Sequence, residues 1–339
     1  MSEQECIFFN IDKPKNEKCC FNINEKFRSY IENVLLFIKN GNEIFSNKNN
    51  FQVSAEDIYS ILISKEFNYQ SKNKILHLKD FSIHIIEKNI ELKKPIPLFY
   101  SVGGGYKATI NKECLSDLNF SLGLGELLII YQICKLEEKI KKIYEPGIIF
   151  NIIIDNGVAN FVNGIPIDKT QRYAESYEKL IKILGKSDSI RLIVQTRDMN
   201  WENESNNIQI GKAREITDDE YCNILRFIGH ECSREEAVVY QARYSAAMDF
   251  SAKLIKKHIG DEIWMLQYSN GKSLTFRSFP GGAARIQAGD IALKIENEKV
   301  RPFLLSIKNI NEFKALKHEC SLDYFMDNFL IKNDNMKKI

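Results

Sequence analysis

An apolar stretch in the middle of the chain does most to limit the fold. Residues 148–154 read Ile-Ile-Phe-Asn-Ile-Ile-Ile, a nearly continuous β-branched run of the kind that is buried on both faces of a sheet. A helix capped by Thr170 and ended by Gly185 is predicted next, and a second buried strand follows at 190–196. This strand, helix, strand order predicts an α/β fold. Its central sheet is mostly parallel and flanked by helices, in a Rossmann-like arrangement.

The chain on either side of this unit has other patterns. Apolar residues recur at helical spacing in 24–39 and after the N-cap candidate Ser54, so the N-terminal region is predicted to be mainly helical. Short strands near 291–295 and 303–307 make the C-terminal portion β-rich. Residues 1–22 are polar and irregular, and we expect both chain ends to fray.

These patterns divide the chain into three parts. We predict a mainly helical N-terminal region at 1–90, an α/β catalytic domain at 91–320, and a C-terminal helix with a charged tail at 321–339. With 339 residues and 44% hydrophobic composition, the chain can bury one large core or the cores of two unequal domains.

Charge and hydropathy exclude several classes of protein. The 47 basic residues nearly balance 45 acidic ones, which argues against a broad cationic face for nucleic acid. Glu3 and Glu5 stand where a signal peptide needs positive charge, and no uninterrupted apolar run approaches the ~20 residues of a membrane span. We therefore expect a soluble cytoplasmic protein that binds neither nucleic acid nor membrane.

The cysteines and histidines give no sign of a metal site. Eight cysteines are scattered without a Cys-x-x-Cys pair and without zinc-module spacing to a histidine. No His-Glu-x-x-His is present either. We expect reduced thiols and no bound metal.

A glycine-rich segment is the leading candidate for the chemical site. A short apolar strand runs into Gly103, Gly104 and Gly105, followed by Tyr106 and Lys107. Glycine lets the backbone approach a ligand closely, so its N–H groups can converge on an anion while the lysine supplies charge. The segment matches neither the P-loop nor the dinucleotide fingerprint, and a plain glycine-rich turn remains the alternative.

Polar residues at the ends of the two buried strands are further candidates. Asp155 and Asn156 follow the first strand, and Arg197 follows the second. Ligands of open α/β sheets gather at the carboxyl ends of strands, which favours a site here. The alternative for Asp155 and Asn156 is an Asp-Asn-Gly turn with local side-chain hydrogen bonds.

Two capping boxes bracket another pair of candidates. Thr217–Glu220 and Ser233–Glu236 each place an acidic residue three positions after a hydroxyl, which predicts two helix starts and makes both glutamates structural. His230 and Glu231 lie between these helices. They could act as general acid and base, or the imidazole could cap the first helix.

Arginines complete the set of candidates. Arg277 and Arg285 surround a Pro-Gly-Gly turn, a geometry that can clamp a phosphate or carboxylate, and the alternative is a hairpin loop with solvated arginines. Arg243, on the helix predicted after Ser233, is a further candidate for substrate binding.

The order of these pieces resembles the isonitrile (isocyanide) synthases, a family that includes the pyoverdine-chromophore and dityrosine-pathway enzymes. The resemblance covers roughly residues 75 to 310. It is carried by the segment 93–107, the helix from 123 through Ile-Tyr-Glu-Pro-Gly at 143–147, the strand into 155–157, Arg-Tyr-Ala at 172–174, Arg-Tyr-Ser at 243–245, Leu-Ile at 254–255 and Gly-Asp-Glu-Ile at 260–263.

The chain departs from the family pattern at three places. Ile154-Asp155-Asn156-Gly157 stands where the family has Ser-Asp-Gly, and Gly-Gly-Gly-Tyr-Lys occupies the lysine segment. Residues 280–285, Pro-Gly-Gly-Ala-Ala-Arg, replace the usual Trp-His-Gly stretch. The resemblance is therefore to a divergent member of the family.

The resemblance implies an enzyme of secondary metabolism that forms a carbon–nitrogen bond, with transferase and lyase chemistry. An amino-acid amine condenses with the ketone of ribulose 5-phosphate, and elimination leaves the sugar C2 as the isonitrile carbon. No metal or organic cofactor is implied. The partners implied are the amino acid and the pentose phosphate, and a downstream Fe(II)/2-oxoglutarate oxygenase and a homodimeric state are left open.

The candidates fit the roles that this chemistry requires. The glycine segment with Lys107 is assigned to the sugar phosphate or to the ketone, and Asp155 to proton transfer or to the substrate ammonium. Arg285 or Arg197 is assigned to an anion, with His230 and Glu231 as reserve acid and base.

Other functions stay open at this point. One is an amino-acid N-formyl or N-acyl forming enzyme on the same fold, another is a phosphosugar-binding regulator without catalysis, and a third is an unrelated nucleotide-binding enzyme. Fold alone does not fix activity.

Overall fold

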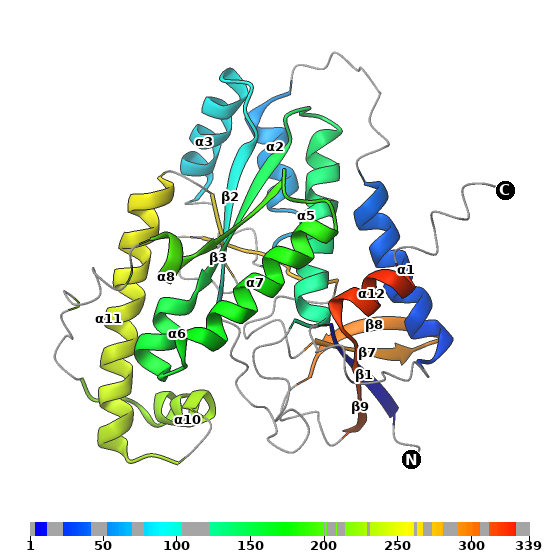
Figure 1. Cartoon of the computed structure of the whole chain (residues 1–339). Helices are drawn as coiled ribbons and strands as arrows, with labels where there is room; N and C mark the ends of the chain where they lie inside the picture. The colour runs from blue at the N-terminus through cyan, green and yellow to red at the C-terminus, as the bar shows by residue number, and fades with distance from the viewer. Residues whose placement is uncertain are drawn as a thin grey trace.

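The computed structural model describes residues 4–11, 23–41, 53–69, 78–103, 122–199, 201, 208, 214–228, 231–260, 263–266, 273–280, 291–305 and 312–329. Figure 1 shows a sheet with helices on both sides and a second, smaller sheet in the lower right of the view.

The central sheet has five strands in the order β4-β3-β2-β5-β6, and every pairing in it is parallel. Its strands are β2 (Ile96–Gly103), β3 (Ile148–Asp155), β4 (Ile190–Val194), β5 (Ile263–Leu266) and β6 (Leu274–Thr275). The strand β3, which pairs with β4 and β2, is buried along nearly its whole length, as its β-branched run predicts. The predicted α/β fold with a parallel central sheet is confirmed.

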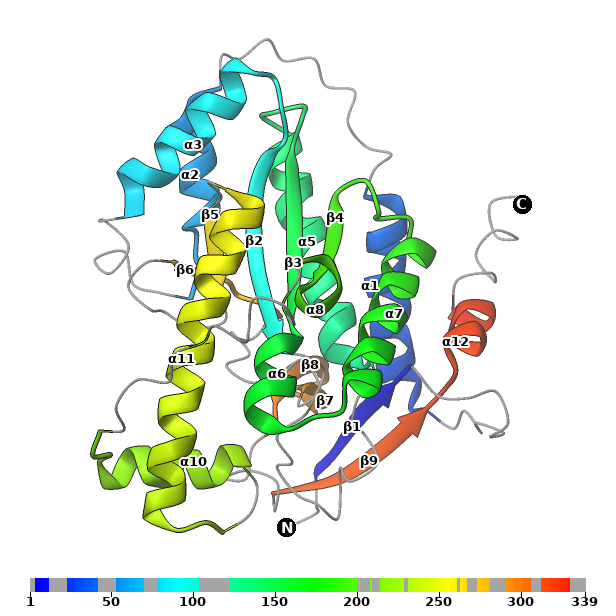
Figure 2. The same ribbon diagram turned by 60° about the vertical axis from the view of Figure 1, so that its left-hand side comes forward.

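Helices cover both faces of this sheet (Figure 2). Side chains alternate along β2 and β3, so Tyr100 and Ile152 join one apolar cluster while Phe99 and Ile153 join another. The helices α5 (Leu124–Lys141) and α7 (Ile167–Ile183) pack on the first cluster, and α6 (Asn156–Asn163) and α11 (Arg234–Ile259) pack on the second. Asp155, two residues beyond Ile153, faces α11 by the same alternation.

The second sheet joins the two ends of the chain and corrects one expectation. Its order is β8-β7-β1-β9, in which β1 (Gln4–Asn10) pairs antiparallel with β7 (Ile291–Glu296) and parallel with β9 (Phe313–Glu319). The prediction that residues 1–22 fray is wrong for this strand, because Cys6 to Asn10 are buried. The strands that pair with β1 are about 300 residues away in sequence, as in Cys6 opposite Lys294 and Gln4 opposite Phe313, so no local pattern predicts them.

A tight hairpin connects β7 to β8 (Lys299–Leu304). Asn297 and Glu298 both have positive φ, 49° and 64°, as the favoured two-residue hairpin turns require. The strand predicted at 303–307 begins earlier, at Lys299, and ends at Leu304, while residues 306 and 307 lie outside the described part of the chain. The turn was missed because it contains no glycine.

The remaining helices are α1 (Glu25–Asn40), α2 (Ala55–Leu62), α3 (Lys79–Glu91), α8 (Gln195–Asp198), α10 (Asp218–Ile228) and α12 (Leu322–Phe329). None of the helices in the described part of the chain has the length and apolar character needed to cross a bilayer.

Local helix signals are confirmed at Ser54, whose hydroxyl caps α2, and at the two capping boxes, and wrong at Thr170. The Thr217–Glu220 and Ser233–Glu236 capping boxes both form at the starts of α10 and α11. The predicted cap at Thr170 is wrong, because α7 begins at Ile167 directly after Pro166. Thr170 lies inside the first turn, where its hydroxyl donates to the Ile167 carbonyl at 3.0 Å.

Replacing Ser233 with Ala is expected to destabilise the protein by about 1 kcal/mol, since the Glu236 amide loses its acceptor. Denaturant unfolding measures the change. Ser245→Ala is the matched control, because Ser245 is exposed in the interior of the same helix and alanine favours helix there. Equal effects of the two substitutions would contradict a specific role for the cap.

Candidate functional site

The candidate site lies where the central strands end. Gly103, the last residue of β2, is directly opposite Asp155, the last residue of β3, across the parallel pair. Neighbouring strands lie about 4.8 Å apart, so the glycine segment begins beside the carboxyl group. Gln195 and Thr196 follow β4, the next strand along. The carboxyl ends of three adjacent strands thus converge, which is where open α/β sheets bind ligands.

Asp155 is buried and has an altered protonation equilibrium. Only 7% of the residue is exposed, and its Oδ1 accepts a hydrogen bond from the Ser251 hydroxyl of α11 at 3.2 Å. Burial raises the pKa of Asp155 to about 7, an effect that Ser251, the Val158 amide and Gln195 oppose by hydrogen bonding. A carboxyl group with this pKa can give or take a proton near neutral pH.

Asn156 links the residues that follow β3 to those that follow β4. Its Nδ2 donates to Thr196 Oγ1 at 2.6 Å, and its Oδ1 accepts from the Thr196 backbone N–H at 3.1 Å. The side chain is fully buried. The contacts seen for Asn156 therefore fix the start of α6 against the start of α8, and its assignment to substrate stays a prediction.

Gln195 and Ser251 belong to the site but were missed from sequence. Gln195 is fully buried and its Nε2 donates to the Ser251 hydroxyl oxygen. The strand-end rule that selects Asp155 applies equally to Gln195, because β4 ends at Val194 and the predicted strand 190–196 is two residues too long. Ser251 lies on a helix far along the chain, and no local pattern marks it.

Arg197 is engaged within the protein. Its guanidinium contacts Glu178 at 2.7 Å and Asp198 at 2.8 Å. The hydrogen bonds to these carboxylates raise the pKa of Arg197. Glu178 lies on α7, so Arg197 is directed to the face of the sheet opposite α11. The structure does not bring Arg197 together with Asp155 in one contact.

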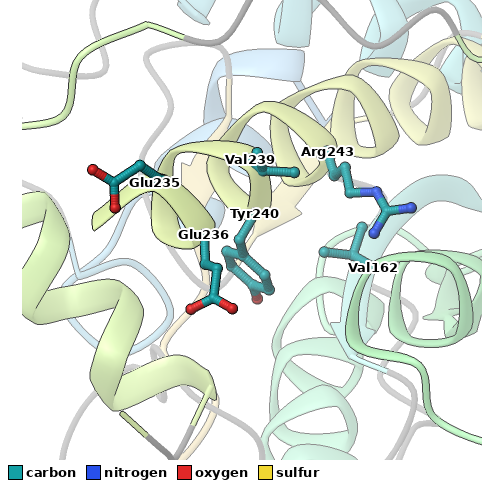
Figure 3. Close-up of a pocket in the computed structure, with 6 residues that line it drawn as sticks. All are labelled: Val162, Glu235, Glu236, Val239, Tyr240 and Arg243. Carbon is teal, nitrogen blue, oxygen red and sulfur yellow. The ribbon is translucent and has the colours of Figure 1, made fainter. Parts of the chain in front are cut away.

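Arg243 lines an open groove of about 390 Å³ between α11 and α6. Figure 3 shows its side chain projecting toward Val162 of α6, while Glu235 points away at the other end. Tyr240 also lines the groove, and burial raises its pKa to about 12. Arg243 precedes Ser251 by eight residues, which is about 12 Å along the helix axis. The groove is thus separate from the Asp155 cluster.

The other predicted residues divide into two groups. Glu231 is exposed in the connection between α10 and α11. Six residues lie outside the described part of the chain: Gly104, Gly105, Tyr106, Lys107, His230 and Arg285. Within the described ranges, no three His, Cys, Asp or Glu side chains gather in a way that could bind a metal ion.

Comparison with known proteins adds a fold neighbour. No family model matches the sequence, and no curated protein matches it. A search of solved structures finds the PvcA protein from Pseudomonas aeruginosa with a TM-score of 0.56 at 14% identity, covering 76% of this chain and 93% of PvcA. The chain has a PvcA-like fold. At this identity the likeness concerns the fold, and activity has to be argued from the site.

Proposed function

We propose that the chain is an isonitrile synthase that converts the amine of an amino acid to an isonitrile, with ribulose 5-phosphate as carbon donor. Two lines support this: the sequence resemblance to the isonitrile synthases, and the fold shared with the PvcA protein. The proposed reaction uses no metal or organic cofactor.

The observation that carries the proposal is the buried carboxyl group of Asp155 beside Gly103. Condensation of an amine with a ketone needs a group that donates a proton as water leaves, and the following elimination needs one that accepts a proton. A single carboxyl group with a pKa of about 7 can serve in both directions at neutral pH. We assign this proton transfer to Asp155.

The glycine segment supplies the second requirement. A phosphorylated sugar needs an anchor for its phosphate, and backbone N–H groups of consecutive glycines can provide one. Because Gly103 is opposite Asp155, a phosphate bound by this segment would leave the sugar chain within reach of the carboxyl group. Lys107 remains our candidate for the positive charge.

Mass spectrometry tests the reaction directly. The purified protein is incubated with ribulose 5-phosphate labelled at C2 and with the twenty amino acids. We expect a labelled product that is heavier than one amino acid by a carbon atom, less the hydrogens lost. Without the protein no such product should form.

Two other outcomes would replace the proposal. A labelled formamide would indicate the N-formyl forming alternative on the same fold. Binding of the pentose phosphate without turnover of any of the twenty amino acids would contradict the proposed substrates and favour the non-catalytic regulator.

A further inference from the structure

Three buried side chains form one hydrogen-bonded series. Gln195 Nε2 donates to Ser251 Oγ, and Ser251 Oγ donates to Asp155 Oδ1. The three residues come from α8, α11 and β3, and their exposed fractions are 0%, 1% and 7%. The series therefore joins the ends of β3 and β4 to the helix that covers them.

The direction of the series is fixed by the chemistry of its members. A serine hydroxyl has one proton to donate and can also accept. Because Ser251 accepts from the Gln195 amide, its own proton is directed to Asp155 Oδ1. The Ser251 hydroxyl is thereby fixed as a donor to the carboxyl group, which also accepts from the Val158 amide and the Gln195 side chain.

Gln195 carries a second feature that a purely structural role does not explain. Its Oε1 is buried and has no hydrogen-bond partner among the residues that the structure describes. A buried acceptor without a donor costs stability, and most folded proteins avoid it. In the Gln195 side-chain amide, the Nε2 donor is thus hydrogen-bonded while the Oε1 acceptor is not.

Among the described residues, the charged groups of α8 and the nearby turns of α11 are directed away from the series. Arg197 and Asp198 of α8 bind one another, and Arg197 also binds Glu178 of α7. On α11, Asp249 and Lys253 are exposed to solvent. Hydrogen bonds are therefore the interactions left to oppose the effect of burial on Asp155.

We propose that Ser251 and Gln195 are positioning residues for proton transfer by Asp155, which hold Oδ1 as an acceptor and so orient the carboxyl group that exchanges the proton with the substrate. This inference rests on the proposed function. It adds two residues to the site, neither of which contacts substrate in the proposal.

Substitutions of Ser251 separate positioning from packing. Ser251→Ala removes the hydrogen bond, so we expect kcat to fall about 10- to 100-fold with KM changed less than about threefold. The ionisation of Asp155 in the kcat profile should move to higher pH, because the bond favours the carboxylate. Ser251→Thr retains the hydroxyl and should restore both values to near those of the unchanged enzyme.

Gln195→Leu is the second variant. It keeps a side chain of similar size and removes the unpartnered Oε1, so the fold should be retained. It also releases the Ser251 proton from its fixed direction, and we expect an intermediate loss of kcat with a shift of the same sign. If Ser251→Ala fails to fold, the kcat and pH profile of Gln195→Leu, compared with those of Ser251→Thr, still test the positioning role.

A direct titration makes the test independent of turnover. Aspartate labelled with ¹³C at the carboxyl carbon reports each titration by NMR, and Asp155→Asn identifies the resonance. We expect the Asp155 titration to move upward in Ser251→Ala and in Gln195→Leu. An unchanged titration and pH profile, with only a lower unfolding temperature, would overturn the inference. A wild-type protein that makes no isonitrile would overturn the proposed reaction, while the titration would still report on the series.

Discussion

Replacing Asp155 with Asn is expected to lower turnover about 10²- to 10⁴-fold, the range for removal of a general acid or base. Asn is close to isosteric, and its oxygen can still accept from Ser251, so the loss should come from proton transfer and not from packing. The measurement is kcat at saturating ribulose 5-phosphate, with substrate binding measured separately. Turnover within about threefold of the unchanged enzyme would remove Asp155 from the mechanism.

The same substitution should raise stability at high pH. The pKa of Asp155 is about 7 in the folded protein against 3.8 for the ordinary group, so the folded state binds more protons between these values. Stability from this group is complete below pH 3.8 and is lost as pH rises through 7. The loss is about 4 kcal/mol at most. Asn does not titrate, so the variant should exceed the parent in stability at pH 8 but not at pH 4.

Asp198 provides a control of opposite sign. Its pKa lies below the ordinary value despite partial burial, because Arg197 and the Val194 amide bind the carboxylate. Asp198→Asn should therefore lose stability at pH 8 and approach the parent as pH falls. Denaturant unfolding of both variants at the two pH values gives the comparison. Equal pH dependence for the parent and Asp155→Asn would contradict a buried carboxyl group with a raised pKa.

The central sheet was predictable because its signals are local. The run at 148–154 is too apolar to face water on either side, and the polar residue at its end had to lie at the edge of the sheet. This signal predicts Asp155, and the glycine-rich run after the apolar strand 96–102 predicts Gly103. Gly103 and Asp155 lie opposite each other because of the strand register, which cannot be read from the sequence. Two parallel strands that end at the same edge of the sheet are nevertheless expected to place their last residues close together.

The rest of the site depends on contacts between distant segments. Ser251 approaches Asp155 only because α11 packs across the ends of β2 and β3, and 96 residues separate the two in the chain. Likewise β1 is buried by strands from the other end of the molecule. The sequence predicts that Arg197 binds a substrate anion, but its guanidinium forms an ion pair with Glu178, which lies on a separate helix. Periodicity reports which face of an element is apolar, not which partner covers it.

Gly157→Ala is expected to destabilise the protein strongly, although it adds only one methyl group. Gly157 lies in the first turn of α6, and a Cβ there would be 2.2 Å from the ring of Trp201. Trp201 is buried and packs edge-on against Phe250 with 4.8 Å between ring centroids, so it cannot move aside freely. Overpacking of this kind costs about 3 kcal/mol or more, which exceeds the gain of about 1 kcal/mol from alanine in a helix.

Gly185→Ala tests whether the cost comes from the ring. Nothing lies within 4 Å of a Cβ at Gly185, but its φ of 66° is unfavourable for alanine, so a loss of about 1 to 2 kcal/mol is expected. Combining Gly157→Ala with Trp201→Leu should cost less than the sum of the two single changes, because the smaller side chain admits the methyl group. Additive costs would place the strain of Gly157→Ala in the backbone of α6. Since this helix begins directly after Asp155, a shift in its first turn should also lower turnover in the folded Gly157→Ala protein.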